Sequence, residues 1–370
     1  MLIGLIAACS FDQVPPTLTV PPLDTPRAGE ISLPLLVEDA DPGIGAIELG
    51  GPAAMAATVD MDRILIDTTL LPDGPTTLTV RAVDSSWYRN AVQVELAMVI
   101  DNTPAEVMLT SRGGGRGRTL AIFTHANEPI SMVFGRGLGA ETAGRVLEPS
   151  VGRWLTGVDL EAELSPMPVV IRVVDRAGNV TQMHTSVEVT DVVYPTGGLI
   201  TLTDAQRRAR EDDTARQQAM ADRQAAYAQD IGEARWSGPF EMPTRGRRTS
   251  PFGKFRSYSD GKKQLHTGLD VAAGTGTRVG AAEAGEVVLA EEQAIYGNVV
   301  IVHHGEGVTT SYNHLSEIAV SVGDVVEKGD RLGAVGSTGQ STGPHLHWGL
   351  VVAGVPVNPD EWLADGFMQP

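Results

Sequence analysis

Apolar and polar residues alternate along much of the first 200 positions of the chain. Leu78-Thr-Val-Arg-Ala-Val-Asp84 and Val92-Gln-Val-Glu-Leu96 carry apolar side chains at every second residue. A period of two is that of a β-strand with one face in a core and the other in water. Between such stretches, Pro72-Asp-Gly-Pro75 has the composition of a turn. The pattern therefore predicts a series of short strands joined by turns.

One strand motif occurs twice. Val80-Arg-Ala-Val-Asp84 returns 91 residues later as Ile171-Arg-Val-Val-Asp175, and a turn with an asparagine follows each copy. An immunoglobulin-like sandwich takes about 100 residues, so this spacing suits one module per copy. Residues 28–102 and 103–197 thus resemble the Ig-like spacer modules of bacterial surface proteins. We expect two β-sandwich modules there.

A proline-free segment separates these strands from the C-terminal third. Thr203 suits the N-cap of a helix. Met220, Tyr227 and Ile231 recur at spacings of seven and four, which gives a thin apolar stripe. We predict a connector helix within residues 201–235 that lies against a neighbouring domain.

The N-terminus carries the only cysteine of the chain, which excludes an internal disulfide and a thiolate metal cluster. The apolar run before Cys9 ends in small residues and resembles a bacterial lipoprotein signal, although it lacks a positively charged start. The alternative is a mere apolar chain end. Residues 14–26 are rich in proline, so we expect residues 1–27 to form a membrane anchor and an extended tether.

Composition and charge narrow the choice of fold and partner. Glycine (42 residues) and proline (23 residues) are frequent and aromatic residues make up 5%, which favours a mostly β fold. The formal net charge of −18 repels nucleic acid phosphates. Nucleic acid is therefore not an expected partner.

Six of the eight histidines lie between His266 and His347. On a strand, His345 and His347 would point to the same face about 7 Å apart, so one could bind a metal while the other faces the same water or substrate. His266-Thr-Gly-Leu-Asp270 adds a second imidazole and a carboxylate. Two histidines and one aspartate suit Zn²⁺ and leave a fourth position for water. A His-x-His pair alone is weak evidence, because half-exposed strand histidines are common.

Other motifs accompany these histidines in a fixed order. They are Thr249-Ser-Pro-Phe-Gly253, His266-Thr-Gly-Leu-Asp270, Tyr296-Gly-Asn-Val-Val-Ile-Val-His303, Ser311-Tyr-Asn-His-Leu315, Val322-Gly-Asp-Val-Val-Glu-Lys-Gly329 and Gly336-Ser-Thr-Gly-Gln-Ser-Thr-Gly-Pro-His-Leu-His347. This series resembles the lysostaphin/LytM-type zinc endopeptidases of bacterial cell walls. The resemblance covers roughly residues 238–363 and implies an antiparallel β metallopeptidase domain over residues 236–370.

The resemblance also implies roles for five side chains. His266, Asp270 and His347 would bind one zinc ion per chain, and His345 would be the general base. His314 would stabilise charge on the tetrahedral intermediate. These roles agree with general chemistry, because zinc lowers the pKa of bound water toward ~7 and a neutral imidazole is matched to accept that proton.

Two departures from the family pattern are visible. Trp348 and the following glycine stand where the family often has Phe-Glu, so we expect Trp348 to replace an aromatic wall, while the loss of the glutamate leaves a supporting contact open. Asn313 replaces a smaller residue before His314, which we expect to be harmless. No role transfers to His303 or His304, which are interpreted as strand and turn residues.

A basic cluster precedes the metal motif in an otherwise acidic chain. It is either a solvated loop or a surface that faces the carboxylates of peptidoglycan stem peptides. Its members are Arg245, Arg247, Arg248, Lys254, Arg256, Lys262 and Lys263.

The expected function is hydrolysis of the peptide cross-links of peptidoglycan, in the periplasm or on a membrane through lipidated Cys9. The modules would be spacers, so a fragment starting near Trp236 would cut alone. One alternative is a non-catalytic family member that binds cell wall or activates an amidase, which the retained site residues disfavour. Another is a biotinyl or lipoyl carrier, suggested by the hairpin around Lys328 but lacking a suitable lysine at its tip. The sequence leaves the bond cut and the oligomeric state open.

Overall fold

The computed structural model describes residues 13–39, 43–204, 207, 212–229, 232–364 and 367. These residues are mainly β-strand, as predicted, and Cys9 lies outside them. Among the described helices, none is long and apolar enough to cross a membrane. The chain divides into two compact units: one comprises Met1–Glu106, Ala126–Ser131 and Val173–Thr181, and the other comprises Val107–His125, Met132–Arg172 and Gln182–Pro370.

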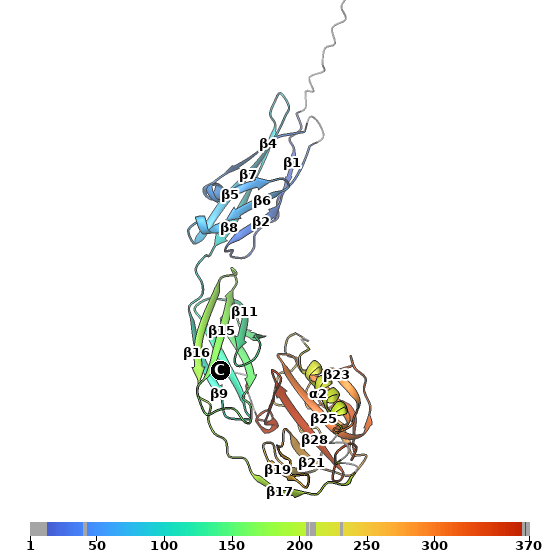
Figure 1. Ribbon diagram of the computed structural model, residues 1–370. Helices are drawn as coiled ribbons and strands as arrows, with labels where there is room; N and C mark the ends of the chain where they lie inside the picture. Colours follow the sequence, from blue (N-terminus) through green and yellow to red (C-terminus); the bar gives the residue numbers. More distant parts are fainter. Residues whose placement is uncertain are drawn as a thin grey trace, which may run out of the picture. The chain divides into compact units, whose positions relative to one another are not determined.

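The N-terminal module consists of antiparallel sheets around a core that includes the fully buried Ile64, Ile66, Leu78 and Val80 (blue in Figure 1). Two 3₁₀ turns, Pro52–Ala56 and Thr68–Leu70, connect its strands. The sheets are β2 (Glu30–Pro34), β6 (Arg63–Asp67) and β5 (Ala57–Asp60); β4 (Ile44–Gly50), β7 (Gly74–Asp84) and β8 (Ala91–Ile100); and β1 (Thr17–Thr19) with β3 (Leu36–Glu38).

Part of the predicted tether belongs to this module. β1 pairs with β3, and the next residue, Val20, is buried in the same core as Ile64. Proline is tolerated beside a short edge strand because no ladder hydrogen bond is lost there. The prediction of a free extended tether is therefore wrong from Thr17 onward.

The following module has two four-stranded sheets, which fits the predicted sandwich, while an Ig-like identity stays a prediction. One sheet runs β13 (Arg145–Glu148), β14 (Val151–Gly157), β10 (Thr119–Ala126), β9 (Val107–Gly113). The other runs β12 (Thr142–Ala143), β11 (Ile130–Arg136), β15 (Met167–Asp175), β16 (Val180–Val187).

The repeated sequence motif marks equivalent turns in the two modules. β7 ends at Asp84 and β15 ends at Asp175, and both side chains are buried. Asp84 accepts a hydrogen bond from the side-chain amide of Asn90, and Asp175 accepts one from that of Asn179. A buried carboxylate thus ties each strand end to the asparagine of its turn, which explains why both residues recur.

The C-terminal region is built around one ten-stranded sheet. Along its main path lie β18 (Arg247–Ser250), β21 (Leu269–Ala272), β28 (His345–Val352), β25 (Val308–Ile318), β24 (Gly297–His303), β23 (Gly285–Gln293) and β26 (Val325–Val326). β22 (Arg278–Gly280), β27 (Arg331–Val335) and β29 (Val355–Val357) pair beside that path, and a 3₁₀ turn (Pro359–Glu361) follows. A small sheet contains β17 (Thr196–Ile200), β19 (Phe255–Tyr258) and β20 (Lys263–Leu265).

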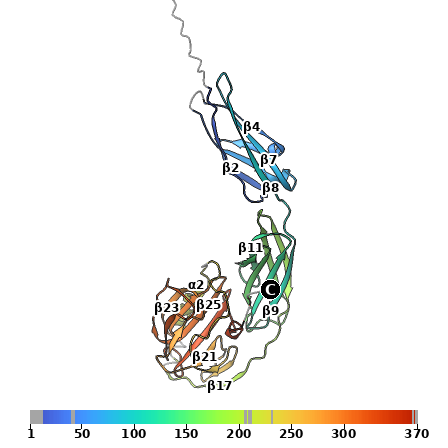
Figure 2. The same ribbon diagram turned by 180° about the vertical axis from the view of Figure 1, so that it is seen from behind.

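Helix α2 (Asp213–Tyr227) lies against β23 and β24 of this sheet, and both views show it on the sheet at β23 (Figures 1 and 2). The predicted connector helix is thus confirmed, but its details differ. Helical structure begins directly after the predicted cap Thr203, whose carbonyl accepts from the Arg207 N–H at 2.9 Å. Helix α2 starts later, where the Asp212 side chain accepts from the Ala215 N–H. The only described helical residues before it are Asp204 and Arg207.

The buried face of α2 includes only part of the predicted apolar stripe, because Tyr227 alone of its described members packs against the cluster of Ala226. Met220 is half exposed, and Ile231 lies outside the described residues. Ala219, Arg223 and Ala226 are buried instead, at spacings of four and three. Small side chains let the helix approach the sheet closely, and the stem of an arginine can pack while its guanidinium finds partners.

The second module and the C-terminal sheet share one core. Phe123 and Leu155 of the module cluster with Trp236, Phe240 and Trp362, and the last three rings meet edge to face at centroid distances of 5.1–6.3 Å. This packing contradicts the spacer prediction for the second module. A fragment starting at Trp236 would expose the apolar face that the module covers.

A buried ion pair crosses the same contact. The Arg153 guanidinium stacks 4.5 Å from the Trp236 ring centroid and donates to both Glu306 oxygens at 3.0 and 2.7 Å. Both side chains are at most 5% exposed. Removing one partner would leave a buried charge, which is strongly destabilising.

Candidate metal centre

Strand register brings three metal-binding side chains together. β21 pairs antiparallel with β28 so that Asp270 lies opposite His347 and Ala272 lies opposite His345. His266 precedes β21 by three residues and is buried. Nε2 of His266, Oδ1 of Asp270 and Nδ1 of His347 lie 2.9–3.0 Å from one another. The predicted ligands His266, Asp270 and His347 thus form one compact triangle.

The hydrogen bonds around His266 fix which ring nitrogen faces this triangle. Its Nδ1 lies 2.8 Å from the carbonyl oxygen of Pro251, which can only accept, so Nδ1 carries the proton. In the neutral ring, Nε2 then presents a lone pair toward the Asp270 carboxylate. Two electron-pair donors 3.0 Å apart in a buried site form an arrangement that a bound cation can bridge.

Two neighbours support this arrangement. Gly268 is required because a Cβ there would lie 2.7 Å from the His347 ring. The second oxygen of Asp270 is paired with Arg256, whose Nη2 also donates to Ser250 Oγ at 2.9 Å. Arg256 therefore holds one oxygen of the Asp270 carboxylate, while the other oxygen belongs to the triangle.

Burial and neighbours set the charge of the ligands. Burial alone would raise the pKa of Asp270, but the adjoining His266 and His347 rings outweigh it and hold the pKa below its usual range. Burial lowers the pKa of His347 to about 4, although Asp270 opposes this shift. At neutral pH the set is thus one carboxylate with a neutral His347, which are the forms that bind metal.

Two more histidines lie beside the triangle, and a backbone carbonyl holds each ring in the same way. Nδ1 of His345 lies 2.8 Å from the carbonyl oxygen of Gly343, and Nδ1 of His314 lies 2.8 Å from that of Thr338. Each ring therefore donates through Nδ1 and turns the lone pair of Nε2 outward. The His345 Nε2 is 3.8 Å from Oδ1 of Asp270, and the two rings are 4.9 Å apart.

The backbone at His314 has an unusual conformation. Its φ is +62°, in the left-handed region that few residues other than glycine adopt. The His314 N–H donates to the Tyr296 carbonyl at 2.8 Å, so the surrounding strands hold this conformation. Burial first, and then the rings of His347 and His345, lower its pKa to about 3. Such strain in a cleft is typical of functional residues.

Asn313, which the sequence analysis treats as harmless, has a structural task. It is fully buried, its Nδ2 donates to the His347 carbonyl at 3.0 Å, and its Oδ1 accepts from Arg223 of α2 at 3.0 Å. The helix is thereby linked to the strand that carries two of the site histidines. Only a structure could reveal this contact, because Arg223 and Asn313 are 90 residues apart.

Other expectations for this region need correction. Trp348 is fully buried in the sheet core and forms no wall of the groove. A Cβ at Gly349 would lie 2.6 Å from Ser311 Oγ, so a glutamate would not fit there without a shift. His303 ends β24 and His304 follows the strand, as predicted, and the His304 side chain is fully buried.

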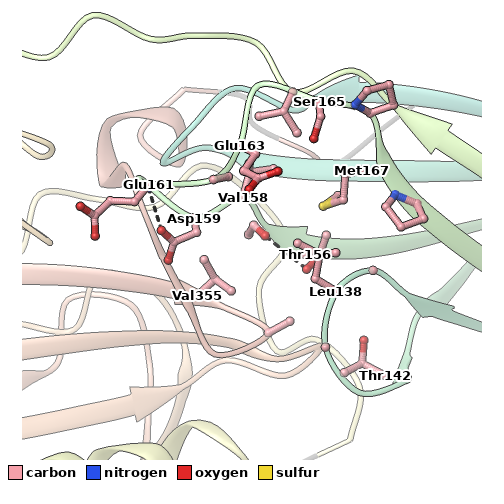
Figure 3. Close-up of a pocket in the computed structure, with 18 of the residues that line it drawn as sticks. Leu138, Thr142, Thr156, Val158, Asp159, Glu161, Glu163, Ser165, Met167 and Val355 are labelled. Atoms are coloured by element: carbon pink, nitrogen blue, oxygen red, sulfur yellow. Dashed lines mark hydrogen bonds between the residues drawn. The ribbon is translucent and has the colours of Figure 1, made fainter.

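A groove of about 460 Å³ surrounds the centre, and its lining includes Asp270, His314 and His345. A larger cavity of about 560 Å³ has an apolar character: Figure 3 shows Leu138, Val158, Met167 and Val355 around it. Its lining contains no histidine, whereas the groove is lined by His314 and His345. A second group of potential ligands among the described residues consists of carboxylates alone: Asp101, Glu128 and Asp175 lie close together in the first unit.

Comparison with known proteins identifies this region. Residues 264–359 match the model of peptidase family M23, and they include all five side chains described above. The C-terminal region is an M23 peptidase domain. The domain is 44% identical over 113 residues to the DD-carboxypeptidase/endopeptidase Mpg of Neisseria meningitidis, covering 30% of this chain and 26% of Mpg. It is 45% identical over 120 residues to the peptidoglycan DD-endopeptidase ShyA of Vibrio cholerae, covering 32% of this chain and 28% of ShyA.

The chain spans about a quarter of the length of these curated relatives. A solved structure of a putative M23 peptidase from Pseudomonas aeruginosa is similar over more of the chain. It aligns with a TM-score of 0.52 at 26% identity and covers 69% of this chain and 96% of that one. Residues 236–370 make up 135 of the 370 residues, so this similarity extends beyond the M23 domain into the preceding region.

Proposed function

We propose that this protein is a zinc-dependent endopeptidase that hydrolyses peptide cross-links of bacterial peptidoglycan. The observation that carries the proposal is the convergence of three metal-binding atoms beside an imidazole whose free lone pair faces the same groove. The M23 match and the names of the related DD-endopeptidases support the reaction and the substrate class.

The donor set fits one zinc ion per chain. Ligand atoms about 2.0–2.1 Å from a tetrahedral zinc are about 3.3 Å apart, close to the 2.9–3.0 Å sides of the triangle. His266 would bind through Nε2, His347 through Nδ1 and Asp270 through Oδ1. When bound, Zn²⁺ supplies a Lewis acid that polarises the scissile carbonyl and lowers the pKa of water toward ~7.

His345 is suited to the role of general base. Its Nδ1 proton is held by the Gly343 carbonyl, so Nε2 can take a proton from the attacking water and later give it to the leaving amine. Ser341 Oγ, 3.2 Å from Nδ1, adds a second contact that fixes the ring.

His314 is suited to stabilise charge on the oxyanion, but only under one condition. Because the Thr338 carbonyl occupies Nδ1–H, the ring can donate from Nε2 only when both nitrogens carry protons. Burial lowers its pKa to about 3, so the ring is neutral in the resting site. The oxyanion-stabilising role that the family implies for His314 therefore requires a proton on Nε2 in addition to the one on Nδ1.

The proposal places the protein in the bacterial cell envelope, with peptidoglycan stem peptides as its substrate. A lipid on Cys9 would hold it at a membrane, which replacement of Cys9 with Ser and membrane fractionation would test. The second module, whose core is shared with the M23 domain, would then be part of the catalytic body rather than a spacer.

Digestion of purified sacculi by the full chain, with mass spectrometry of the released fragments, tests the activity. Cross-linked dimers should decrease and uncross-linked stem peptides should increase. Binding to sacculi with no change in cross-linking, in zinc-loaded protein, would instead favour the non-catalytic alternative.

A further inference from the structure

The members of the basic cluster that precedes the metal motif lie in different environments. Arg248 pairs with Asp360 at 2.7 Å, and Arg256 pairs with Asp270. Lys262 and the three arginines near β18 are exposed. Lys254 and Arg256 are both half-buried and line the groove of the metal centre. Of the two, only Arg256 has a carboxylate partner among the described residues.

A strand from outside the matched M23 residues positions this lysine. β17 runs parallel to β19, with Thr196 opposite Phe255, and the Phe255 N–H donates to the Pro195 carbonyl at 3.0 Å. Gly197 then lies under the lysine stem: a Cβ at that position would be 3.1 Å from Cε and 3.7 Å from Cγ of Lys254. The missing side chain leaves room for the Phe255 carbonyl oxygen, 2.9 Å from such a Cβ, and for the Lys254 stem beside it.

The charges of the groove are unbalanced. Its lining contains two cationic side chains, Lys254 and Arg256, and a single carboxylate, Asp270. Asp270 is already engaged by Arg256 and by the two histidines of the triangle. Among the described residues, no carboxylate forms an ion pair with Lys254. An unpaired, partly desolvated ammonium in a protein of net charge −18 favours an anionic group of a ligand.

We propose that Lys254, laid across Gly197, binds a carboxylate of the substrate and makes the protein select stem peptides with free carboxylates over amidated ones. This inference rests on the proposed peptidase function. Both Lys254 and Gly197 lie outside residues 264–359, so the selection would be a property of this chain's β17–β19 wall. A charge-assisted contact of this kind acts mainly on binding, so KM rather than kcat should carry the effect.

The test uses the full zinc-loaded chain and a synthetic cross-linked stem-peptide dimer, prepared once with free carboxylates and once with the same groups as primary amides. Wild type should cleave the free form with a kcat/KM about tenfold higher than the amide form. Lys254→Gln should lose about tenfold on the free form through KM and change little on the amide form. Lys254→Arg should keep the preference, and Lys262→Gln, an exposed lysine outside the groove, should behave as wild type.

A separate binding measurement distinguishes this inference from the reaction itself. The dissociation constants of an uncross-linked stem peptide, free and amidated, are measured for wild type and Lys254→Gln. A Lys254-dependent preference in binding without any cleavage would support the inference and contradict the peptidase proposal. Cleavage in which Lys254→Gln has no effect, or lowers activity equally on both dimers, would overturn the inference and leave the peptidase standing.

Discussion

His266 and His304 are both buried in the C-terminal region, and both hold Nδ1 against a backbone carbonyl at 2.7–2.8 Å. Their second nitrogens differ. Nε2 of His304 lies 2.8 Å from the Thr310 hydroxyl, which in turn lies 2.9 Å from that of Tyr312. Among the described residues, Nε2 of His266 contacts polar atoms of Asp270 and His347 only. The environment of the second nitrogen therefore distinguishes a histidine that completes the core, His304, from a candidate metal ligand, His266.

This comparison predicts that substitutions at the two kinds of site separate activity from stability. The largest effect is expected for His345→Ala, which should lower the rate of dimer cleavage by ~10²–10⁴-fold, the range for loss of a general base. The variant should still bind zinc, because His345 is not a member of the triangle. Steady-state cleavage and metal analysis of the same sample check both points. Wild-type cleavage by this variant would move the base elsewhere, with His314 next in reach.

The opposite behaviour is expected for His304→Ala. It removes a fully buried ring and leaves the Ala284 carbonyl and the Thr310 hydroxyl without this partner, which should lower the free energy of unfolding by about 2–4 kcal/mol. Zinc content and kcat of the folded protein should not change. Denaturant unfolding measures the first effect, and an unaltered midpoint would show that His304 does not support the core.

A smaller effect appears when pH is varied. Burial lowers the pKa of His304 to about 3, against about 6.5 when unfolded. Above pH 6.5 both states are neutral. As pH falls from 6.5 toward 3, the unfolded state takes up a proton that the folded state refuses, so stability is lost. The stability of wild type relative to His304→Gln should fall by about 2–3 kcal/mol between pH 6.5 and 4.5.

The carboxylates of the two proteins titrate alike, so they cancel in this difference. A constant difference across the pH range, measured by parallel denaturant titrations, would show that the folded protein tolerates a protonated His304.

The sequence predicts the parts of this molecule that depend on local pattern. Alternating residues predict the strands, and the spacing of His345 and His347 places both on one strand, as β28 shows. The sequence also indicates which residues could bind a metal, and the side chains of His266, Asp270 and His347 do lie together in the structure. What it misses depends on contacts across long separations, such as Arg223 with Asn313 and Arg153 with Glu306.

The dependence on contacts between distant residues also explains the predictions that the structure corrects. Met220 fits an apolar helical stripe, yet α2 docks through Ala219 and Ala226 because the sheet surface selects small side chains. Val20 sits among prolines and suggests a tether, yet it completes the core of the first module. The second module has the pattern of a spacer, yet Phe123 and Leu155 are buried against Trp236 and its neighbours. In each case tertiary packing decides, and local propensity does not encode it.

The most direct test of the account is the zinc content of the purified protein and four variants. Wild type and His304→Ala should each hold one zinc ion per chain by elemental analysis after dialysis. His266→Ala, Asp270→Ala and His347→Ala should each hold far less, because two ligands do not retain zinc as three do. Full occupancy in all three triangle variants, or none in wild type after refolding with zinc, would contradict the metal centre on which the proposed function depends.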